Sequence, residues 1–369
     1  MSPGLYIHIP FCRSKCPYCA FYSIPSSSLI PIWLNGLKKE ALLYKGQFGP
    51  FDSLYLGGGT PTFLETGILA DLIGHLFAHF DFAPDTEVTI EANPCDLTDE
   101  KTRMLRELGV NRVNLGVQSF DDSVLSFLGR RHRVKEVNGA LNRLRRYGFK
   151  NVCIDLIYGF KEQGLKRWIA TLDTALSFQP EHISCYQLTL EKKTVFGRLR
   201  DKGKIEPLME SEEADYFLTT SQHLEDKGYI HYEISNFAKD KAFRSRHNQK
   251  YWRHTPYLGL GPSAHSFHKK RRWWNVRSIR KYCAAVEKGR PPVEGSEDLT
   301  EEQLRIETLS LGFRTSTGID LKAFKSTPES DAVLSRLQTS GLVKVIDGRV
   351  IPSREGFLVA DHLPVCFFD

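Results

Sequence analysis

The sequence predicts an α/β protein: an incomplete, TIM-like (β/α)6 barrel followed by a C-terminal α+β domain that resembles a winged helix. Short β-branched or aromatic segments recur six times between residues 5 and 188, and amphipathic segments separate them. This alternation is typical of βαβ units and a parallel sheet. Beyond residue 300, two helical segments precede a hairpin signal. A doubly wound sheet is the competing architecture.

The six expected strands are short runs with high β-propensity. They lie at residues 5–9, 53–57, 87–91, 112–117, 151–158 and 182–188. The expected helices lie at residues 66–80, 98–108, 133–147, 164–178 and 211–227. Thr98, followed by two acidic residues, is a good helix start, and Gly109 and Gly148 are good helix stops. Six units without an eighth predict a barrel that does not close.

The strand–helix rhythm ends after residue 237, where aromatic, Gly, Pro and charged residues predominate. We therefore expect a core at 1–237 and a second domain at 238–369. Within it, helices are expected from about residue 300 and at 328–340, followed by a hairpin at Asp347-Gly348. The region 300–369 thus resembles a winged helix. Its candidate recognition helix carries one Arg and two acids, which favours a structural role over nucleic-acid binding.

Composition places the chain among ordinary globular proteins. It has 369 residues, 41% hydrophobic and 25% charged, with a formal net charge of +6. We expect no transmembrane segment, because no apolar run approaches the roughly 18 residues required. The N-terminus does not read as a signal peptide, so a cytoplasmic location with reduced cysteines is expected. Basic clusters at 129–133, 143–150 and 268–274 read mostly as solvated faces, although the last ends in paired tryptophans suited to an anion or a ring.

Three cysteines, Cys12, Cys16 and Cys19, directly follow the first strand with the spacing C-x3-C-x2-C. Thiolates suit iron–sulfur clusters, and a [4Fe–4S] cluster normally takes four of them. Three thiolates would leave one iron open to a small chelating molecule. Two alternatives remain: an apolar helix face, which Pro17 disfavours, and a zinc site completed by His8.

The cysteine spacing, with Tyr18 before the last Cys, resembles the radical S-adenosylmethionine (radical SAM) superfamily. The resemblance implies a barrel fold and a [4Fe–4S] cluster held by Cys12, Cys16 and Cys19. It also implies that the unligated iron binds SAM, which an electron from the cluster cleaves to a 5′-deoxyadenosyl radical.

Further motifs follow later strands. LGGGTPTFL comes after the second strand, and its glycines would let the backbone approach a ligand closely. YIHIPFC, GGGTPT, IEANP, NLGVQSF and IDLIYG together resemble the oxygen-independent coproporphyrinogen III oxidase family. That resemblance implies a set of SAM-contacting residues: Tyr6, Tyr18, Gly58, Gly59, Thr60, Glu91, Gln118, Arg130 and Asp155.

The sequence departs from the oxidase pattern at two places. Phe21 stands where the oxidase has a further cysteine, and the long arm ahead of Tyr6 is absent. HNQKYW (247–252) instead resembles the signature of heme chaperones that descend from the same family. This resemblance implies that the protein binds heme, with His247 as the candidate ligand, and delivers it to apo-proteins such as respiratory enzymes. Residue types alone favour a structural histidine, and His254, His265 and His268 are also near.

Three functions are therefore weighed. The first is a heme chaperone that carries a [4Fe–4S] cluster and SAM. The second is a radical enzyme that oxidatively decarboxylates coproporphyrinogen III, for which Phe21 is the main difficulty. The third is a radical enzyme acting on tRNA, suggested only by the basic clusters, and no nucleic-acid partner is expected. A homodimer is left open.

Overall fold

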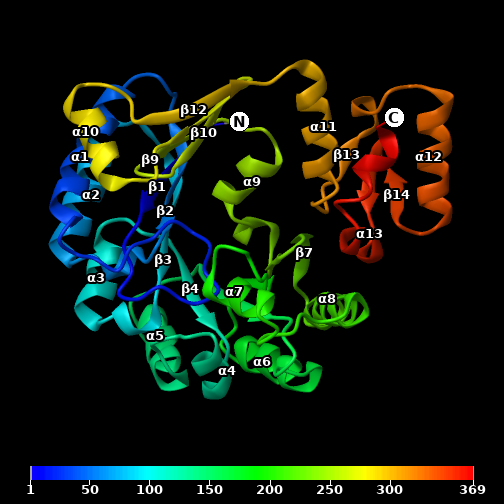
Figure 1. Cartoon of the computed structure of the whole chain (residues 1–369), viewed down its shortest axis with the longest axis horizontal. Helices are drawn as coiled ribbons and strands as arrows, with labels where there is room; N and C mark the ends of the chain where they lie inside the picture. Colours follow the sequence, from blue (N-terminus) through cyan, green and yellow to red (C-terminus); the bar gives the residue numbers. More distant parts are fainter. Residues whose placement is uncertain (1, 369) are drawn as a thin grey trace.

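A computed structural model describes residues 2–368. Its centre is a largely parallel sheet of twelve strands in the order β12-β11-β10-β9-β1-β2-β3-β4-β5-β6-β8-β7 (Figure 1). The strands of the parallel part are β1 (Gly4–Ile9), β2 (Phe51–Gly58), β3 (Phe82–Ala92), β4 (Arg112–Gln118), β5 (Val152–Tyr158), β6 (His182–Gln187) and β9 (Tyr257–Leu260). The six strands expected between residues 5 and 188 are confirmed, and the fold is mixed α/β.

Helices connect the parallel strands. They are α1 (Ile30–Leu43), α2 (Thr66–His79), α3 (Asp99–Glu107), α4 (Asp122–Phe127), α5 (Val134–Arg146), α6 (Leu165–Ser177), α7 (Val195–Asp201) and α8 (Glu210–Asp226). The Thr98 hydroxyl caps α3 by accepting a hydrogen bond from the Lys101 amide at 3.1 Å. Gly109 and Gly148 have positive φ (84° and 75°) just after α3 and α5. These stops are as expected.

The chain beyond residue 229 adds further strands to the same sheet, which the sequence pattern did not predict. The antiparallel additions are β7 (Ile230–Glu233) and β8 (Asn236–Ala238) at one edge and β10 (His265–His268), β11 (Arg271–Asn275) and β12 (Val293–Asp298) at the other. Helices α9 (Arg246–Trp252) and α10 (Ile279–Glu287) lie between these strands in the sequence. β9 pairs in parallel with β1, so the first strand lies inside the sheet.

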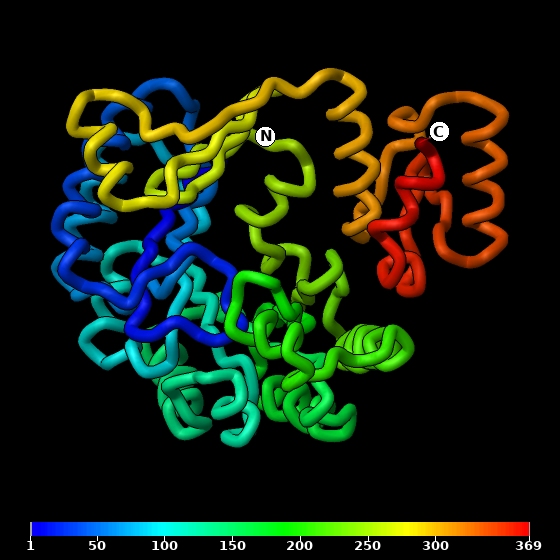
Figure 2. Tube along the Cα trace, in the orientation of Figure 1, coloured from blue at the N-terminus to red at the C-terminus, as the bar shows by residue number. Residues whose placement is uncertain are grey.

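The last part of the chain forms a separate lobe (Figure 2). It contains α11 (Glu301–Gly312), β13 (Ile319–Asp320), α12 (Pro328–Thr339), β14 (Val343–Ile346), β15 (Arg349–Pro352) and α13 (Arg354–Leu358). β14 and β15 form the expected hairpin, with Asp347 and Gly348 both at positive φ. The lobe has its own apolar core and reaches α8 through an ion pair between Arg354 and Glu225. The division at residues 237 and 238 stays a prediction.

Successive side chains of each strand point to opposite faces of the sheet, so one face forms the apolar core and the other lines a cavity. Leu5, Ile7 and Ile9 of β1 are fully buried in the main apolar core beneath the helices. Tyr6, between them, points to the opposite face and lines a cavity. The carboxyl ends of parallel strands share one edge, so side chains on this second face converge there. Among residues 2–368 no helix is both long and apolar enough to span a bilayer.

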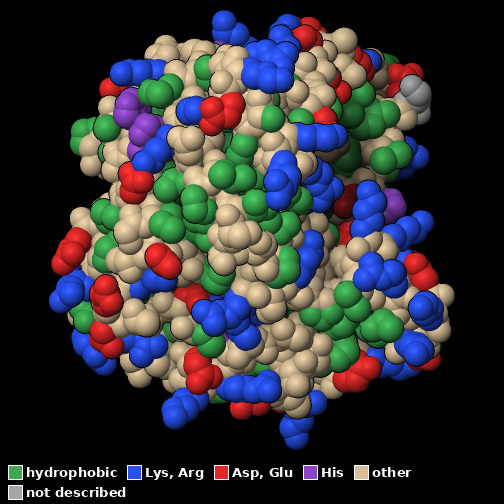
Figure 3. All heavy atoms as spheres, turned by 60° about the vertical axis from the view of Figure 1, so that its left-hand side comes forward, with side chains coloured by type: hydrophobic (Ala, Val, Ile, Leu, Met, Phe, Trp, Pro, Cys, Tyr) green, Lys and Arg blue, Asp and Glu red, His purple; other side chains and the backbone are tan. Residues whose placement is uncertain are grey.

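The short 3-10 helices do not change this architecture. Those described lie at Pro61–Phe63, Pro94–Asp96, Lys241–Phe243, Leu321–Ala323 and Pro364–Phe367. On the face seen in Figure 3, Lys and Arg side chains are interspersed with Asp and Glu and do not form one continuous basic patch.

Candidate cofactor-binding site

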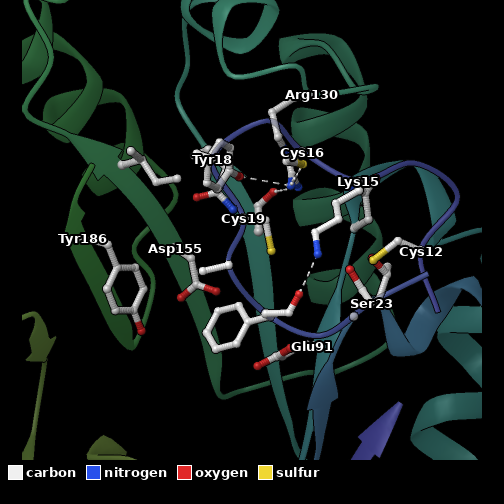
Figure 4. Close-up of a pocket in the computed structure, with 18 of the residues that line it drawn as sticks. Cys12, Lys15, Cys16, Tyr18, Cys19, Ser23, Glu91, Arg130, Asp155 and Tyr186 are labelled. Carbon is white, nitrogen blue, oxygen red and sulfur yellow. Dashed lines mark hydrogen bonds between the residues drawn. The ribbon is translucent and has the colours of Figure 1, made fainter. Parts of the chain in front are cut away.

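A cavity of about 670 Å³ opens at the carboxyl ends of the parallel strands (Figure 4). The three cysteines of the first loop line it together with every residue that the family resemblance implied for SAM. These residues are Cys12, Cys16, Cys19, Tyr6, Tyr18, Gly58, Gly59, Thr60, Glu91, Gln118, Arg130 and Asp155. The sequence thus identified residues from several strands and loops that the fold brings to one place.

Backbone hydrogen bonds hold both ends of the cysteine loop. The Cys12 amide donates to the Ile24 carbonyl at 3.2 Å, and the Ile24 amide donates to the Pro10 carbonyl at 2.8 Å. Between these anchors the Cys19 amide donates to the Cys16 carbonyl at 3.1 Å, which makes a tight turn. All three thiols are free and half-buried. The loop therefore presents three thiols to the cavity from one short segment.

Two polar groups already approach the sulfur atoms. The Thr60 hydroxyl lies 3.5 Å from the Cys12 Sγ, and Arg130 Nη1 lies 3.4 Å from the Cys16 Sγ. Both groups are hydrogen-bond donors, which suits sulfur atoms that carry negative charge when they ligate iron. Three free thiols lining one cavity match in number and kind the ligand set of a [4Fe–4S] cluster that keeps one iron open, while the described residues place no three ligating side chains around a single metal-ion position.

His8 does not complete a zinc site with these thiols. Its Nδ1 lies 3.0 Å from the Tyr6 hydroxyl, its Nε2 lies 2.9 Å from the Tyr22 carbonyl, and the ring does not line the cavity. Burial lowers the pKa of His8 to about 4, with a smaller opposing effect from the Tyr22 hydrogen bond. Both ring nitrogens have partners, so His8 has no lone pair free for a metal.

Gly58 and Gly59 allow the end of β2 to pack closely against β1 and the start of the cysteine loop. Gly58 has φ of 105°, and a Cβ there would lie 2.5 Å from the His8 Cε1. A Cβ on Gly59 would lie 2.6 Å from the Phe11 carbonyl oxygen. The Gly59 amide also donates to the Ile9 carbonyl at 2.8 Å. Close packing of the end of β2 against β1 and the segment after it thus requires small residues here, and both glycines also line the cavity, so their approach to a ligand stays a prediction.

Glu91 is a half-buried residue whose two carboxyl oxygens both accept hydrogen bonds. The Tyr55 hydroxyl donates to Oε1 at 2.8 Å, and the Gly58 amide donates to Oε2 at 3.1 Å. Burial raises the pKa of Glu91 to about 7; Tyr55 and Gly58 oppose the rise and nearby Asp155 adds to it. Burial likewise raises the pKa of Asp155. The floor of the cavity thus holds two carboxyl groups with a reduced tendency to ionise.

Several polar atoms around the cavity are buried without a hydrogen-bond partner in the described structure. They include Asn114 Oδ1, Ser23 Oγ and Arg130 Nε. Such atoms cost free energy unless a ligand or water pairs with them. Gln118, on the same wall, has φ of 68° where the pairing of β4 with β5 shifts register. Unpaired polar atoms beside a strained residue are typical of a site that a polar ligand completes.

Some lining residues escaped the sequence analysis, namely Tyr55, Asn114 and Tyr186. Each lies on the same face of its strand as the cavity. In the sheet Tyr6 pairs with Tyr55, and Asn114 pairs with Glu91. The alternation of strand residues was the available signal: once one inward residue of a strand is known, residues two positions away face the same side.

His247 lies outside the cavity, sealed behind it. Its Nδ1 lies 3.1 Å from the Ser53 hydroxyl and its Nε2 lies 2.9 Å from the Tyr251 hydroxyl. The ring centroid is 5.2 Å from that of Tyr55 and 6.1 Å from that of Tyr6. Burial lowers its pKa to about 3, with a smaller contribution from Lys250.

This environment bears on the expectation that His247 binds heme. The side chain is 1% exposed, and neither ring nitrogen is free for iron. The Glu87 carboxylate also accepts from the amides of Arg246 and His247, which fixes the start of α9. An axial bond to iron would require the ring to give up a partner and become exposed. In this structure His247 holds α9 against β2.

Comparisons with known proteins agree on one group. Residues 6–175 match the Radical SAM superfamily. The chain is 37% identical to the heme chaperone HemW of Bacillus subtilis (strain 168) over 97% of both chains. It is 35% identical to HemW of Escherichia coli (strain K12) over 71% of this chain and 69% of that protein.

One solved structure extends the comparison to the fold. The coproporphyrinogen III oxidase HemN of Escherichia coli, described as a radical SAM enzyme, superposes with a TM-score of 0.84. The match covers 99% of this chain and 90% of that one, at 24% sequence identity. At that identity the likeness establishes the shared mixed α/β fold.

Proposed function

The chain belongs to the HemW family of the radical SAM superfamily, and on that premise we propose that it is a heme chaperone: it binds heme and delivers it to apo-proteins such as respiratory enzymes. The observation that carries the proposal is the 37% identity to a HemW protein over 97% of both chains. Identity at this level over the full length makes a shared activity the first expectation.

The cofactors of the proposal are a [4Fe–4S] cluster and SAM. Cys12, Cys16 and Cys19 would hold the cluster, which supplies one-electron chemistry when bound. The SAM-contacting candidates are Tyr6, Tyr18, Gly58, Gly59, Thr60, Glu91, Gln118, Arg130 and Asp155, and all of them line the cavity. Among this chain's own groups, Arg130 offers a donor suited to a carboxylate, and Tyr55 holds Glu91 in place.

The alternative function is oxidative decarboxylation of coproporphyrinogen III, because HemN shares the fold. Phe21 weighs against it. Its side chain is 70% exposed at the mouth of the cavity, at the position where the oxidase family has another cysteine. Anaerobic incubation with SAM, reductant and coproporphyrinogen III should therefore yield no protoporphyrinogen. Formation of that product at a rate dependent on Cys12, Cys16 and Cys19 would favour the oxidase instead.

The main experiment is anaerobic reconstitution with iron and sulfide, followed by titration with hemin. The expected results are cluster absorption, a change in the reduced cluster's electron paramagnetic resonance spectrum on adding SAM, and a Soret band that saturates at a fixed heme ratio. Transfer to an apo-cytochrome then tests delivery. Absence of saturable heme binding would refute the chaperone proposal and leave the cofactor proposal standing.

We also propose finer features of the architecture and location. The parallel strands β1 to β6 are proposed to act as an incomplete (β/α)6 barrel within a core at 1–237. The region 300–369 is proposed to be a structural, winged-helix-like unit, supported by its two helices and the β14–β15 hairpin. A cytoplasmic location suits a protein whose cluster needs reduced thiols.

A further inference from the structure

A second groove of about 560 Å³ lies outside the cysteine cavity, between the end of α1 and the β10–β11 hairpin. It shares no lining residue with that cavity. Aromatic side chains, a histidine and consecutive cations line it, and no feature of the proposed cofactor chemistry uses them. The groove carries the basic cluster that ends in paired tryptophans. The residues that line this groove therefore suggest a ligand different from the one in the cysteine cavity.

The histidine of this groove, His268, differs from others in the same half of the chain. Its ring makes no hydrogen bond within residues 2–368, and its Nδ1 is buried without a partner. By contrast both ring nitrogens of His247 are bonded, and His254 lies 3.2 Å from Glu307 and 3.4 Å from Thr308. Nε2 is not among the buried atoms, so it is the ring nitrogen of His268 that a ligand in the groove can reach.

The walls of the groove are aromatic rings fixed by packing. Phe48 meets His268 edge-on, with ring centroids 5.1 Å apart, and is stacked on Phe51 at 5.8 Å. On the strand side, Trp273 is stacked on Tyr44 at 6.4 Å with 20° between the ring planes. Rings held in this way offer flat apolar surfaces to a planar ligand at little entropic cost.

The charge of the lining is positive. Lys269, Lys270 and Arg271 face one acid, Asp298. Lys270 pairs with Glu301, and Arg271 donates to the neutral Ser296 hydroxyl at 3.0 Å. Lys269, at the tip of the turn with φ of 59°, makes no ion pair with any described residue. Figure 3 brings forward the side of the molecule that carries α1, where basic and hydrophobic side chains adjoin. Lys269 and Arg271 are thus available to carboxylates.

A planar aromatic ligand with a metal that accepts imidazole and with two carboxylates matches all three features. We propose that this groove is the heme site, with a ring nitrogen of His268 as the axial ligand to iron and Lys269 and Arg271 facing the propionates. The proposal rests on the proposed chaperone function and specifies where its cargo binds. A lone pair of the neutral imidazole forms the iron bond; no electron is transferred and no proton is released.

This location has a functional advantage that the cavity lacks. A carrier must release its cargo chemically unchanged, and a groove with separate walls keeps heme apart from the radical-forming cavity. The groove is also open at the surface, where Lys269 and Lys270 are exposed, so an acceptor protein can reach the bound heme directly.

The test is an anaerobic hemin titration of the full chain carrying its cluster, comparing His268→Ala with His265→Ala. His265 lies on the same strand, its side chain faces the other side of the sheet, and it is stacked on Trp274 at 6.1 Å, so it is a matched control. We expect His268→Ala to weaken heme binding about tenfold or more, or about 1.4 kcal/mol, and to remove the imidazole-ligated Soret signature. His265→Ala should leave both unchanged.

A second measurement keeps the proposal testable if His268→Ala misfolds. Wild-type protein should bind hemin better than either hemin dimethyl ester, which lacks carboxylates, or iron-free protoporphyrin, which lacks the axial bond. Lys269→Ala with Arg271→Ala should weaken hemin binding without shifting the Soret maximum.

The outcomes separate the two proposals. No saturable heme binding by wild type refutes the chaperone function itself. Saturable binding that survives His268→Ala, or that His247→Ala abolishes with His268 intact, overturns the His268 site and leaves the chaperone function in place.

Discussion

The cysteine cavity and the His247 pocket share Tyr6 and Tyr55 as a common wall. They differ in whether their polar atoms have hydrogen-bond partners within the protein. Around the cavity, buried atoms such as Asn114 Oδ1 lack partners among the described residues, and the thiols are free. Around His247 both ring nitrogens are bonded and the side chain is 1% exposed. A recognisable sequence motif can therefore mark a ligand site, where polar groups are left unpaired, or a structural contact, where every polar group is already hydrogen-bonded.

The largest effect should come from the cavity thiols. Replacing any one of Cys12, Cys16 and Cys19 by Ala removes a cluster ligand and should abolish cluster incorporation, because two thiolates hold a cubane poorly. Iron and sulfide analysis after anaerobic reconstitution measures this. Cys366→Ala, at an exposed thiol elsewhere, is the matched control and should retain a full cluster. Normal iron content in all three cavity variants would contradict the assignment.

The His247 pocket should respond through stability instead. His247→Ala loses two buried hydrogen bonds and leaves a cavity, so the free energy of unfolding should fall by about 2–4 kcal/mol. Tyr251→Phe, which removes only the bond to Nε2, should cost about 1 kcal/mol. Urea unfolding followed by circular dichroism measures both. If His247→Ala were as stable as wild type, the structural role of this residue between α9 and β2 would be wrong.

Substitution of Gly58 should affect both stability and cofactor binding. Its φ is positive, and an added Cβ would lie only 2.5 Å from the His8 ring, so Gly58→Ala should cost about 1–3 kcal/mol. The variant should also bind SAM more weakly, since the Gly58 amide holds Glu91. Gly67→Ala, at a helix position with open space around it, provides the control. Equal stabilities would show that the loop adapts freely.

The last contrast is in the pH dependence of stability, where the two regions should differ in sign. Glu91 has a pKa raised to about 7, so its contribution is present below about pH 4.5 and is lost as pH rises to 7. His247 has a pKa lowered to about 3, so its contribution is present above about pH 6.5 and is lost as pH falls toward 3.

Subtracting variants from wild type isolates these contributions. The stability difference between wild type and Glu91→Gln should fall by about 1–3 kcal/mol from pH 5 to pH 8, and the difference between wild type and His247→Gln should rise over about pH 4 to 6.5. Unfolding curves at several pH values measure both. If the Glu91→Gln and His247→Gln stability differences changed with pH in the same direction, the predicted difference in sign between the two regions would be wrong.

The sequence predicted the parallel strands well, and its candidate site residues lie around one cavity, because both sets depend on local patterns. Strand alternation and the cysteine spacing are visible over a few residues, and the fold brings them together. The helix α1 was missed because Gly36 interrupts its pattern. A Cβ there would lie 3.2 Å from atoms of Tyr282 and Cys283, so the glycine is set by packing against α10, a contact that local sequence does not reveal.

The strands after residue 237 were missed for a related reason. β9 has four residues, and its partner β1 lies some 250 positions away in the chain. Short strands of this kind owe their conformation to their neighbours. The same applies to His247: residue types suggested two readings, and only the hydrogen bonds to Ser53 and Tyr251 distinguish them.

The parallel pairing of β9 with β1 also constrains how the protein is made. β1 leaves the ribosome early and gains one neighbour in β2, while its other edge stays open until residues 257–260 have been translated. At roughly 5–20 residues per second this interval lasts on the order of ten seconds or more. The strand that leads into the cysteine loop is thus an unprotected edge during synthesis, prone to pairing with other nascent chains.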